Sequence, residues 1–166
     1  MTHERTIEMA LRQIVKFGDE ILRKKSRPVT NFDERLWTLL DDMAETMHSK
    51  DGAGLAAVQV GVLRRAVVID VHDEHGVIEL INPEIVSAEG TQTGNEGCLS
   101  APNVWEEVER PNIVTVKAQD RSGKEFTLTG SALLARAFCH ELDHLDGVLF
   151  IDHVKQTPEH RDITKR

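Results

Sequence analysis

The chain has little cysteine, no long apolar segment and a deficit of positive charge. Its 166 residues include two cysteines, and 20 lysines and arginines stand against 28 aspartates and glutamates, for a formal net charge of −8. No apolar run approaches the roughly 20 residues that a membrane-spanning helix needs. An acidic chain is also poorly suited to holding a polyanion, so neither membrane insertion nor DNA binding is expected.

The first residues, MTHE, lack the apolar stretch of a signal peptide, so we expect a cytoplasmic protein. In that reducing compartment Cys98 and Cys139 should be thiols rather than a disulfide. No internal repeat and no Ser/Gly/Pro-rich linker divides the sequence. We therefore expect a single domain over residues 1–166, with residues 1–8 as a candidate N-terminal extension and residues 153–166 as a short tail.

Two segments have the apolar spacing of helices. The first is expected to begin at an Asn31 N-cap and to end near Lys50, and its apolar positions recur three and four residues apart. They are Leu36, Leu39, Leu40, Met43 and Met47. We interpret the methionines as core packing rather than as a ligand groove, because methionine commonly fills gaps in cores. The second segment, residues 132–145, is apolar nearly all round, which predicts a helix buried on most sides.

The region between the two helices is rich in β-forming residues. Short strands are expected at residues 66–69, 77–81, 104–109, 113–118 and 125–128. The second of these should stop at Asn82-Pro83, and the last two should form a hairpin around residues 120–123. The order of helix, strands and helix predicts an α+β fold, in which short antiparallel or mixed sheets pack around the central helix at 132–145.

That central helix ends in the sequence HELDH at 140–144, which fits the HExxH pattern. Residues four apart share a helical face with Cβ atoms about 5–6 Å apart, so His140 and His144 can bind one metal ion. Glu141 then stands where its carboxylate can reach a metal-activated water. Two exposed histidines on a polar helix end are the plain alternative, but the apolar body of the helix favours buried imidazoles, which need partners.

A catalytic site of this kind usually has three protein ligands, and the residues alone leave the third open. The candidates are Cys98, Cys139, Asp152 and His153. Cys139 is turned about 100° from His140 on the helix, so we expect it to face the core. Cys98 lies among small residues, in the segment NEGCLS at 95–100, where backbone can come close to a metal.

A third motif is the glycine-rich segment GAGLAAVQVG at 52–61. It lacks the lysine of a phosphate-binding loop and the spacing of a dinucleotide-binding loop, so neither is expected. A helix C-cap that leads into a strand accounts for the glycines, which also allow a ligand to approach the backbone closely. The Gln59 amide is a neutral donor that could stabilise an oxyanion.

Together and in this order, the segments 52–59, 96–100 and 140–144 resemble the three motifs of the peptide deformylases, and the similarity extends from about Leu11 to Asp152. The resemblance implies a metal-dependent hydrolase that removes the formyl group from N-formyl-methionyl nascent peptides. It implies Fe²⁺ as the native cofactor, one per chain, with Zn²⁺, Ni²⁺ or Co²⁺ as substitutes. The roles it implies are metal ligands Cys98, His140 and His144, general base Glu141, and oxyanion donors in the Gln59 amide and the Leu99 backbone N–H.

The substrate pocket is expected to involve Gly54, Leu55, Leu133 and Ala137, because Leu133 and Ala137 share the helical face of His140 and the small Ala137 leaves room for a thioether. Some members carry an arginine just past the cysteine motif that helps to hold the peptide. Trp105 stands there in this chain, so that contact is expected to differ.

Two other functions compete with deformylation. An HExxH metallopeptidase of other specificity would need a different third ligand and a cleft open to internal peptides. A metal-stabilised binding module would have no use for Glu141, because structural sites close their fourth position. The partners expected are formylated nascent peptides and, weakly, the ribosome, since the tail carries a local charge of +2; a solvated end is the favoured account of that charge.

Overall fold

The computed structural model describes residues 10–154, so the candidate extension and nearly all of the tail lie outside the described residues. The elements, in chain order, are η1 (Glu20–Arg23), α1 (Glu34–Ser49), β1 (Gly54–Ala56), η2 (Ala57–Val60), β2 (Ala66–Ile69), β3 (Ile78–Glu89), β4 (Gln92–Cys98), β5 (Ala101–Arg110), β6 (Ile113–Gln119), β7 (Glu125–Ser131), α2 (Leu133–Leu145) and η3 (Phe150–His153), where η denotes a 3-10 helix. None of these helices is both long and apolar enough to cross a bilayer.

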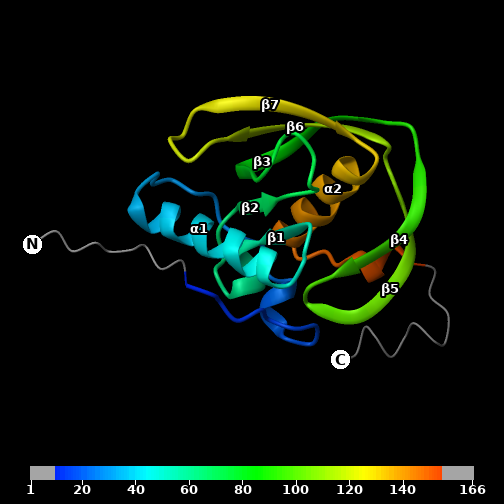
Figure 1. The fold of residues 1–166 in the computed structure, drawn as a ribbon, viewed down its shortest axis with the longest axis horizontal. Coiled ribbons are helices and arrows are strands. Elements are labelled where there is room, and N and C mark those ends of the chain that lie inside the picture. The colour runs from blue at the N-terminus through cyan, green and yellow to red at the C-terminus, as the bar shows by residue number, and fades with distance from the viewer. Residues whose placement is uncertain (1–9, 155–166) are drawn as a thin grey trace, which may run out of the picture.

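The strands form two antiparallel sheets (Figure 1). The larger has the order β1-β2-β3-β6-β7, and the smaller is a ribbon of β4 and β5. Helix α2 packs against β1, β2, β6 and β7 and also contacts β5, so it lies at the centre of the fold. This arrangement confirms the predicted α+β class with its central helix.

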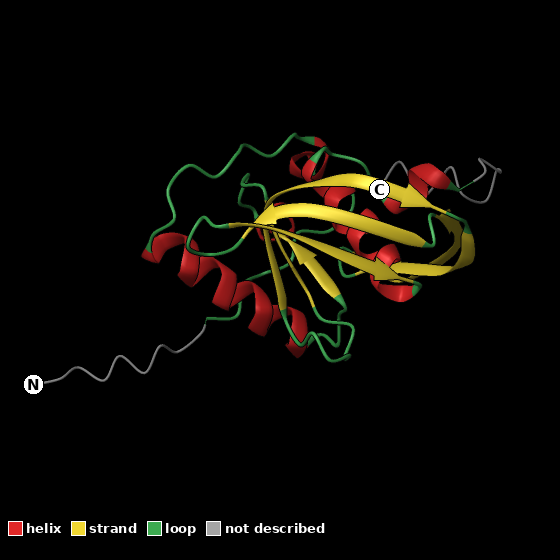
Figure 2. Ribbon diagram, turned by 90° about the horizontal axis from the view of Figure 1, so that it is seen from above, coloured by secondary structure: helices red, strands yellow, loops and turns green. Residues whose placement is uncertain are grey.

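Strand β2 shows how the core is organised. Its four residues are all buried, because alternate side chains of a strand point to opposite faces and both faces are covered. Val67 and Ile69 join the core around α2, whereas Ala66 and Val68 join a second core under α1. Figures 1 and 2 show the two helices on opposite sides of this part of the sheet. Part of the sheet is therefore a wall between two helices.

Helix α1 confirms the predicted apolar stripe but not its predicted N-cap. Met43 and Met47 are fully buried in the second core, as expected for packing residues. The helix begins at Glu34, and its N-cap is Asp33, whose Oδ1 accepts a hydrogen bond from the Leu36 N–H at 3.2 Å. The capping residue thus lies two positions later than Asn31.

Strand β3 continues past the point where the sequence predicted its end. It runs from Ile78 to Glu89, and its pairing with β6 shifts register between Ile81 and Glu84. Asn82 has a φ of 51° there, and its side chain bonds both the N–H and the C=O of Val29. Pro83 has no backbone N–H to donate to a neighbouring strand, and the bulge places it outside the regular pairing. The strand therefore continues beyond Pro83.

Candidate active site

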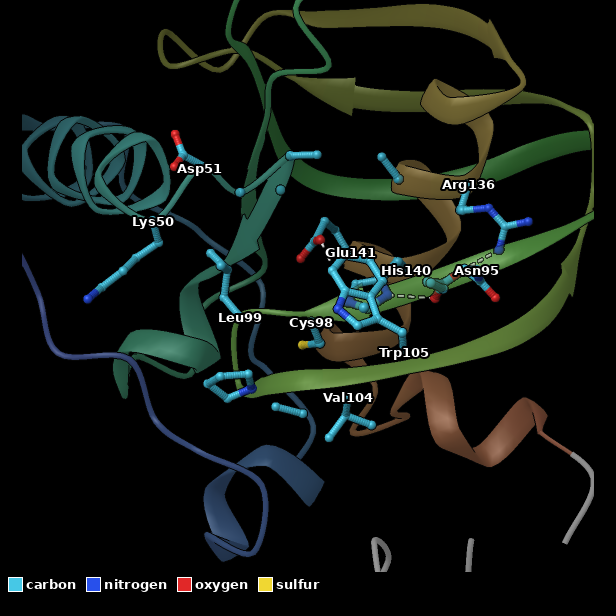
Figure 3. A pocket seen from close by; sticks show the side chains of 18 of the residues that line it. Lys50, Asp51, Asn95, Cys98, Leu99, Val104, Trp105, Arg136, His140 and Glu141 are labelled. Atoms are coloured by element: carbon cyan, nitrogen blue, oxygen red, sulfur yellow. Dashed lines mark hydrogen bonds and ion pairs between the residues drawn. The ribbon is translucent and has the colours of Figure 1, made fainter. Parts of the chain in front are cut away.

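Three potential metal ligands come together where α2 passes the end of β4. His140 and His144 lie one turn apart on α2, with their Nε2 atoms 3.3 Å apart. Cys98 ends β4, and its Sγ lies 3.4 Å from His144 Nε2. The ligand atoms of all three residues lie within 4.8 Å of one another. Figure 3 shows Cys98 and His140 pointing into the same pocket, with Glu141 beside them.

These donors fit a transition-metal ion. With metal–nitrogen bonds of about 2.0–2.1 Å and a metal–sulfur bond of about 2.3 Å, neighbouring ligand atoms of a tetrahedral site lie about 3.3–3.6 Å apart. The distances of 3.3 and 3.4 Å measured here match such edges. Two imidazoles and one thiolate suit iron and zinc alike. The remaining candidate ligands lie elsewhere: Asp152 pairs with Arg23, and His153 bonds Asp143.

A buried charge network holds His140 in place. Its Nδ1–H donates to Glu96 Oε2 at 2.6 Å, which leaves the Nε2 lone pair directed toward Cys98 and His144. The same carboxylate accepts from Arg110 at 2.6 and 3.1 Å and from Arg136 at 2.8 Å. Glu96 is only 4% exposed. Glu96 carried no predicted role, although its place two residues before Cys98, in the segment 96–100, was an available signal.

The electrostatics of the network favour a bound cation. Burial alone would raise the pKa of Glu96, but its hydrogen bonds with His140 and Arg110 hold that pKa well below its usual range. Burial lowers the pKa of His144, so its imidazole is neutral and able to ligate. Burial alone would lower the pKa of His140, but the neighbouring Glu141 carboxylate raises that pKa well above 6.5. A position that attracts a proton this strongly is one where a metal cation can replace it.

Glu141 is buried beside the ligands, but its carboxylate is only partly engaged. Its Oε1 has no hydrogen-bond partner within residues 10–154, and its Oε2 lies 3.9 Å from His140 Nε2. Burial raises the pKa of Glu141 to about 7. Gly54 makes room for it, since a Cβ at position 54 would lie 2.5 Å from Glu141 Oε2. A buried, unpartnered carboxylate facing a pocket has the properties of a general base.

The Gln59 amide is oriented toward the same place. Its Oε1 accepts the Ala56 N–H at 2.9 Å, which fixes which end of the amide faces Cys98. Its Nε2 then donates to Ser100 Oγ at 3.1 Å and lies 3.4 Å from Cys98 Sγ. Leu99 follows Cys98 directly, so its backbone amide borders the site.

A pocket of about 650 Å³ opens onto these groups. Of the residues predicted to bind substrate, Gly54, Leu133 and Ala137 line it, together with Cys98, Leu99, His140 and Glu141. The Leu55 side chain does not line it; it is fully buried in the second core, so Leu55 can offer a ligand only its backbone. Cys139 packs in the core around α2, which confirms its predicted orientation.

Comparisons with known proteins agree on one family. The family model for polypeptide deformylase matches residues 11–160. A peptide deformylase of Caldicellulosiruptor bescii is 60% identical over 158 residues, covering 95% of this chain and 94% of that protein. A peptide deformylase structure from Legionella pneumophila superposes with a TM-score of 0.88 at 47% identity and covers 95% of this chain and 92% of that one. A Met-Ala-Ser-bound peptide deformylase from Acinetobacter baumannii superposes with a TM-score of 0.83 at 30% identity, covering 88% and 99%.

The fold and the pocket thus define a hydrolase whose catalytic groups gather between a central helix and a β-ribbon. The chain belongs to the polypeptide deformylase family, whose members depend on a metal ion. It is an enzyme that removes the N-formyl group from nascent peptides.

Proposed function

We propose that this chain hydrolyses the amide bond between the formyl group and the methionine nitrogen, with one Fe²⁺ ion held by Cys98, His140 and His144. The observation that carries the proposal is the convergence of these three ligand atoms within 4.8 Å beside a buried, partly unpartnered carboxylate. An ion held there would act as a Lewis acid, acidifying water and polarising the formyl carbonyl.

Glu141 is the proton carrier in this mechanism. It accepts the proton of the attacking water and later delivers it to the nitrogen that leaves as the free amine of methionine. A pKa of about 7 suits both steps, because the group can then gain and lose a proton near neutral pH. A cation held by the three ligands would favour the carboxylate form of Glu141, so the base would be available when substrate binds.

Gln59 and Leu99 stabilise the charge that develops on the formyl oxygen. The side-chain Nε2 of Gln59 and the backbone N–H of Leu99 donate hydrogen bonds to this oxyanion. The contact of Gln59 with Ala56 supports this role, because it fixes the donor end of the amide before substrate arrives. Ser100, which accepts from Gln59, limits the movement of the amide further.

The methionine side chain occupies the part of the pocket between Gly54, Leu133 and Ala137. These residues are small or apolar and line the pocket next to Glu141, which suits an unbranched thioether. Leu133 is 54% exposed, so a methionine side chain would cover apolar surface that otherwise faces water.

The proposal also includes where the enzyme acts and whether it contacts the ribosome. The enzyme acts in the cytoplasm as a single domain over residues 1–166, on chains that emerge from the ribosome. Any contact with the ribosome is weak. If the basic tail makes that contact, co-sedimentation at low salt should be lost when residues 154–166 are removed. Equal co-sedimentation of both forms would remove the tail from the proposal.

Metal content of two cysteine variants tests the site. Protein prepared without oxygen should contain about one iron per chain and should hydrolyse formyl-Met-Ala-Ser. Cys98→Ala should lose most of the metal, whereas Cys139→Ala, the matched control in the core, should keep it. Equal metal retention in both variants would contradict the ligand assignment, and activity that tracked zinc alone would contradict the choice of Fe²⁺.

A further inference from the structure

Trp105 is the most exposed large apolar side chain between residues 10 and 154, and it lines the active-site pocket. Trp105 is 67% exposed, and its indole N–H has no hydrogen-bond partner among residues 10–154. The other tryptophan, Trp37, is 36% exposed and donates its N–H to the Arg121 carbonyl at 2.7 Å. A large aromatic ring left facing water at a pocket commonly marks a binding surface.

The ring of Trp105 is held against the backbone of strand β4. A Cβ at position 97 would lie 2.7 Å from Cζ3 of Trp105, so the ring occupies the space that only a glycine leaves open. Gly97 precedes Cys98, and both Trp105 and Cys98 line the same pocket. In Figure 3 Trp105 projects from the ribbon strand that borders the pocket. Because β5 is paired with β4 on both sides of this position, the ring has a firm support.

The position of the ring relative to the methionine pocket indicates what it binds. The methionine side chain is assigned to the wall formed by Gly54, Leu133 and Ala137, whereas Trp105 projects from β5. A peptide whose first residue fills the inner pocket must lead its second residue out across the pocket mouth. Among the described residues that line this pocket Trp105 is the one tryptophan, and no phenylalanine lines it, so the second side chain can pack on the exposed face of the indole.

We propose that Trp105 is a specificity-determining residue that contacts the side chain following formyl-methionine and favours an apolar, above all an aromatic, residue there. The inference rests on the proposed function, because it assumes that methionine fills the inner pocket. The indole is uncharged and offers mainly apolar area, so its contribution should grow with the apolar size of the second side chain.

A ratio of specificity constants tests the proposal. For each enzyme, kcat/KM is measured for formyl-Met-Phe-Ser and for formyl-Met-Ala-Ser. The wild type should favour the phenylalanine peptide by about 3- to 10-fold, the range that an aromatic pair contributes. Trp105→Ala should bring the ratio near one, Trp105→Phe should retain most of it, and Trp37→Ala should leave it unchanged. A ratio that is the same in Trp105→Ala and wild type would overturn the proposal, even if both rates fell together.

A binding measurement separates this inference from the proposed chemistry. The chain has two tryptophans and no tyrosine, so Trp37→Phe leaves Trp105 as its single tryptophan fluorophore. The product tripeptide Met-Phe-Ser, added until dialysis shows saturation, should shift the emission to shorter wavelength and slow quenching by acrylamide. Met-Ala-Ser should do so less. Unchanged emission with bound Met-Phe-Ser would overturn the role of Trp105, whereas a wild type that hydrolysed no formyl peptide would instead overturn the proposed function.

Discussion

Replacing Glu96 by glutamine should weaken both the fold and the metal site. The carboxylate is buried and accepts hydrogen bonds from Arg110, Arg136 and His140. Glutamine has nearly the same shape but no charge, and its NH₂ group would face donors instead of accepting from them. Two buried guanidinium groups would then lose their common counter-charge, and His140 would lose the acceptor that orients its ring.

The structure sets the size of the effect. Breaking a buried ion pair by removing one partner typically costs about 3–5 kcal/mol. We expect the lower end of that range, because Arg110 keeps Asp143 at 2.8 Å and Arg136 keeps the Val108 carbonyl at 3.1 Å. Loss of an outer-shell partner of a metal-bound histidine usually costs about 10- to 100-fold in metal affinity or activity. The metal affinity of Glu96→Gln should fall within that range.

Two measurements check these values. Urea unfolding of metal-free protein, followed by circular dichroism, gives the change in unfolding free energy, and competition with a chelator gives metal affinity. Glu109→Gln is the matched control, because Glu109 is exposed on β5 and its loss should stay within about 0.5 kcal/mol. If Glu96→Gln unfolds like the control and binds metal like the wild type, the network does not support the site and the reasoning is refuted.

Two further changes test local features by urea unfolding. Ala132 has φ 53° and ψ −121°, a conformation strained for any residue but glycine, so Ala132→Gly should raise the unfolding free energy by about 1 kcal/mol; a loss would contradict the strain. Asp152→Asn should lower it by about 1 kcal/mol at pH 7, because the variant loses an ion pair with Arg23 and weakens a bond from the Leu149 N–H. Burial alone would raise the pKa of Asp152, but Arg23 holds it below 3.8, so its contribution is present above pH 3.8 and is lost as the pH falls further. The difference between Asp152→Asn and wild type should therefore shrink toward pH 3, and a gap that widened on acidification would contradict the assignment.

Local sequence patterns predicted the parts of the fold that depend on residues close together in the chain. The apolar stripe of α1 and the all-round apolar α2 follow from side chains three and four residues apart, and the turn at residues 120–123 predicted the β6–β7 hairpin. Strand β4 was not predicted, because its residues, QTGNEGC, show no alternation of apolar and polar side chains. It is a strand because β5 pairs with it, and that is a tertiary contact.

The site residues likewise fall into those that helix spacing brings together and those that only the tertiary fold brings together. His140, Glu141 and His144 are close because a helix makes them close, so the spacing was enough to predict a shared site. Cys98 reaches them only through the path of the β4–β5 ribbon. The small residues around Cys98 favoured it as the third ligand, but the residues alone left the choice open and the family resemblance supplied the assignment. The support of His140 by Glu96 depends on that same path, which no pattern along the chain encodes.

The most direct test of the mechanism is the metal content and turnover of Glu141→Gln. The proposed ligands Cys98, His140 and His144 are unchanged in this variant, so about one metal ion per chain should remain. Turnover of formyl-Met-Ala-Ser should fall by about 10²–10⁴-fold, the usual contribution of a positioned acid–base group, because an amide cannot accept the proton. His140→Ala should differ by losing metal and activity together. Loss of the ion from Glu141→Gln, or turnover within a few-fold of wild type, would contradict the account.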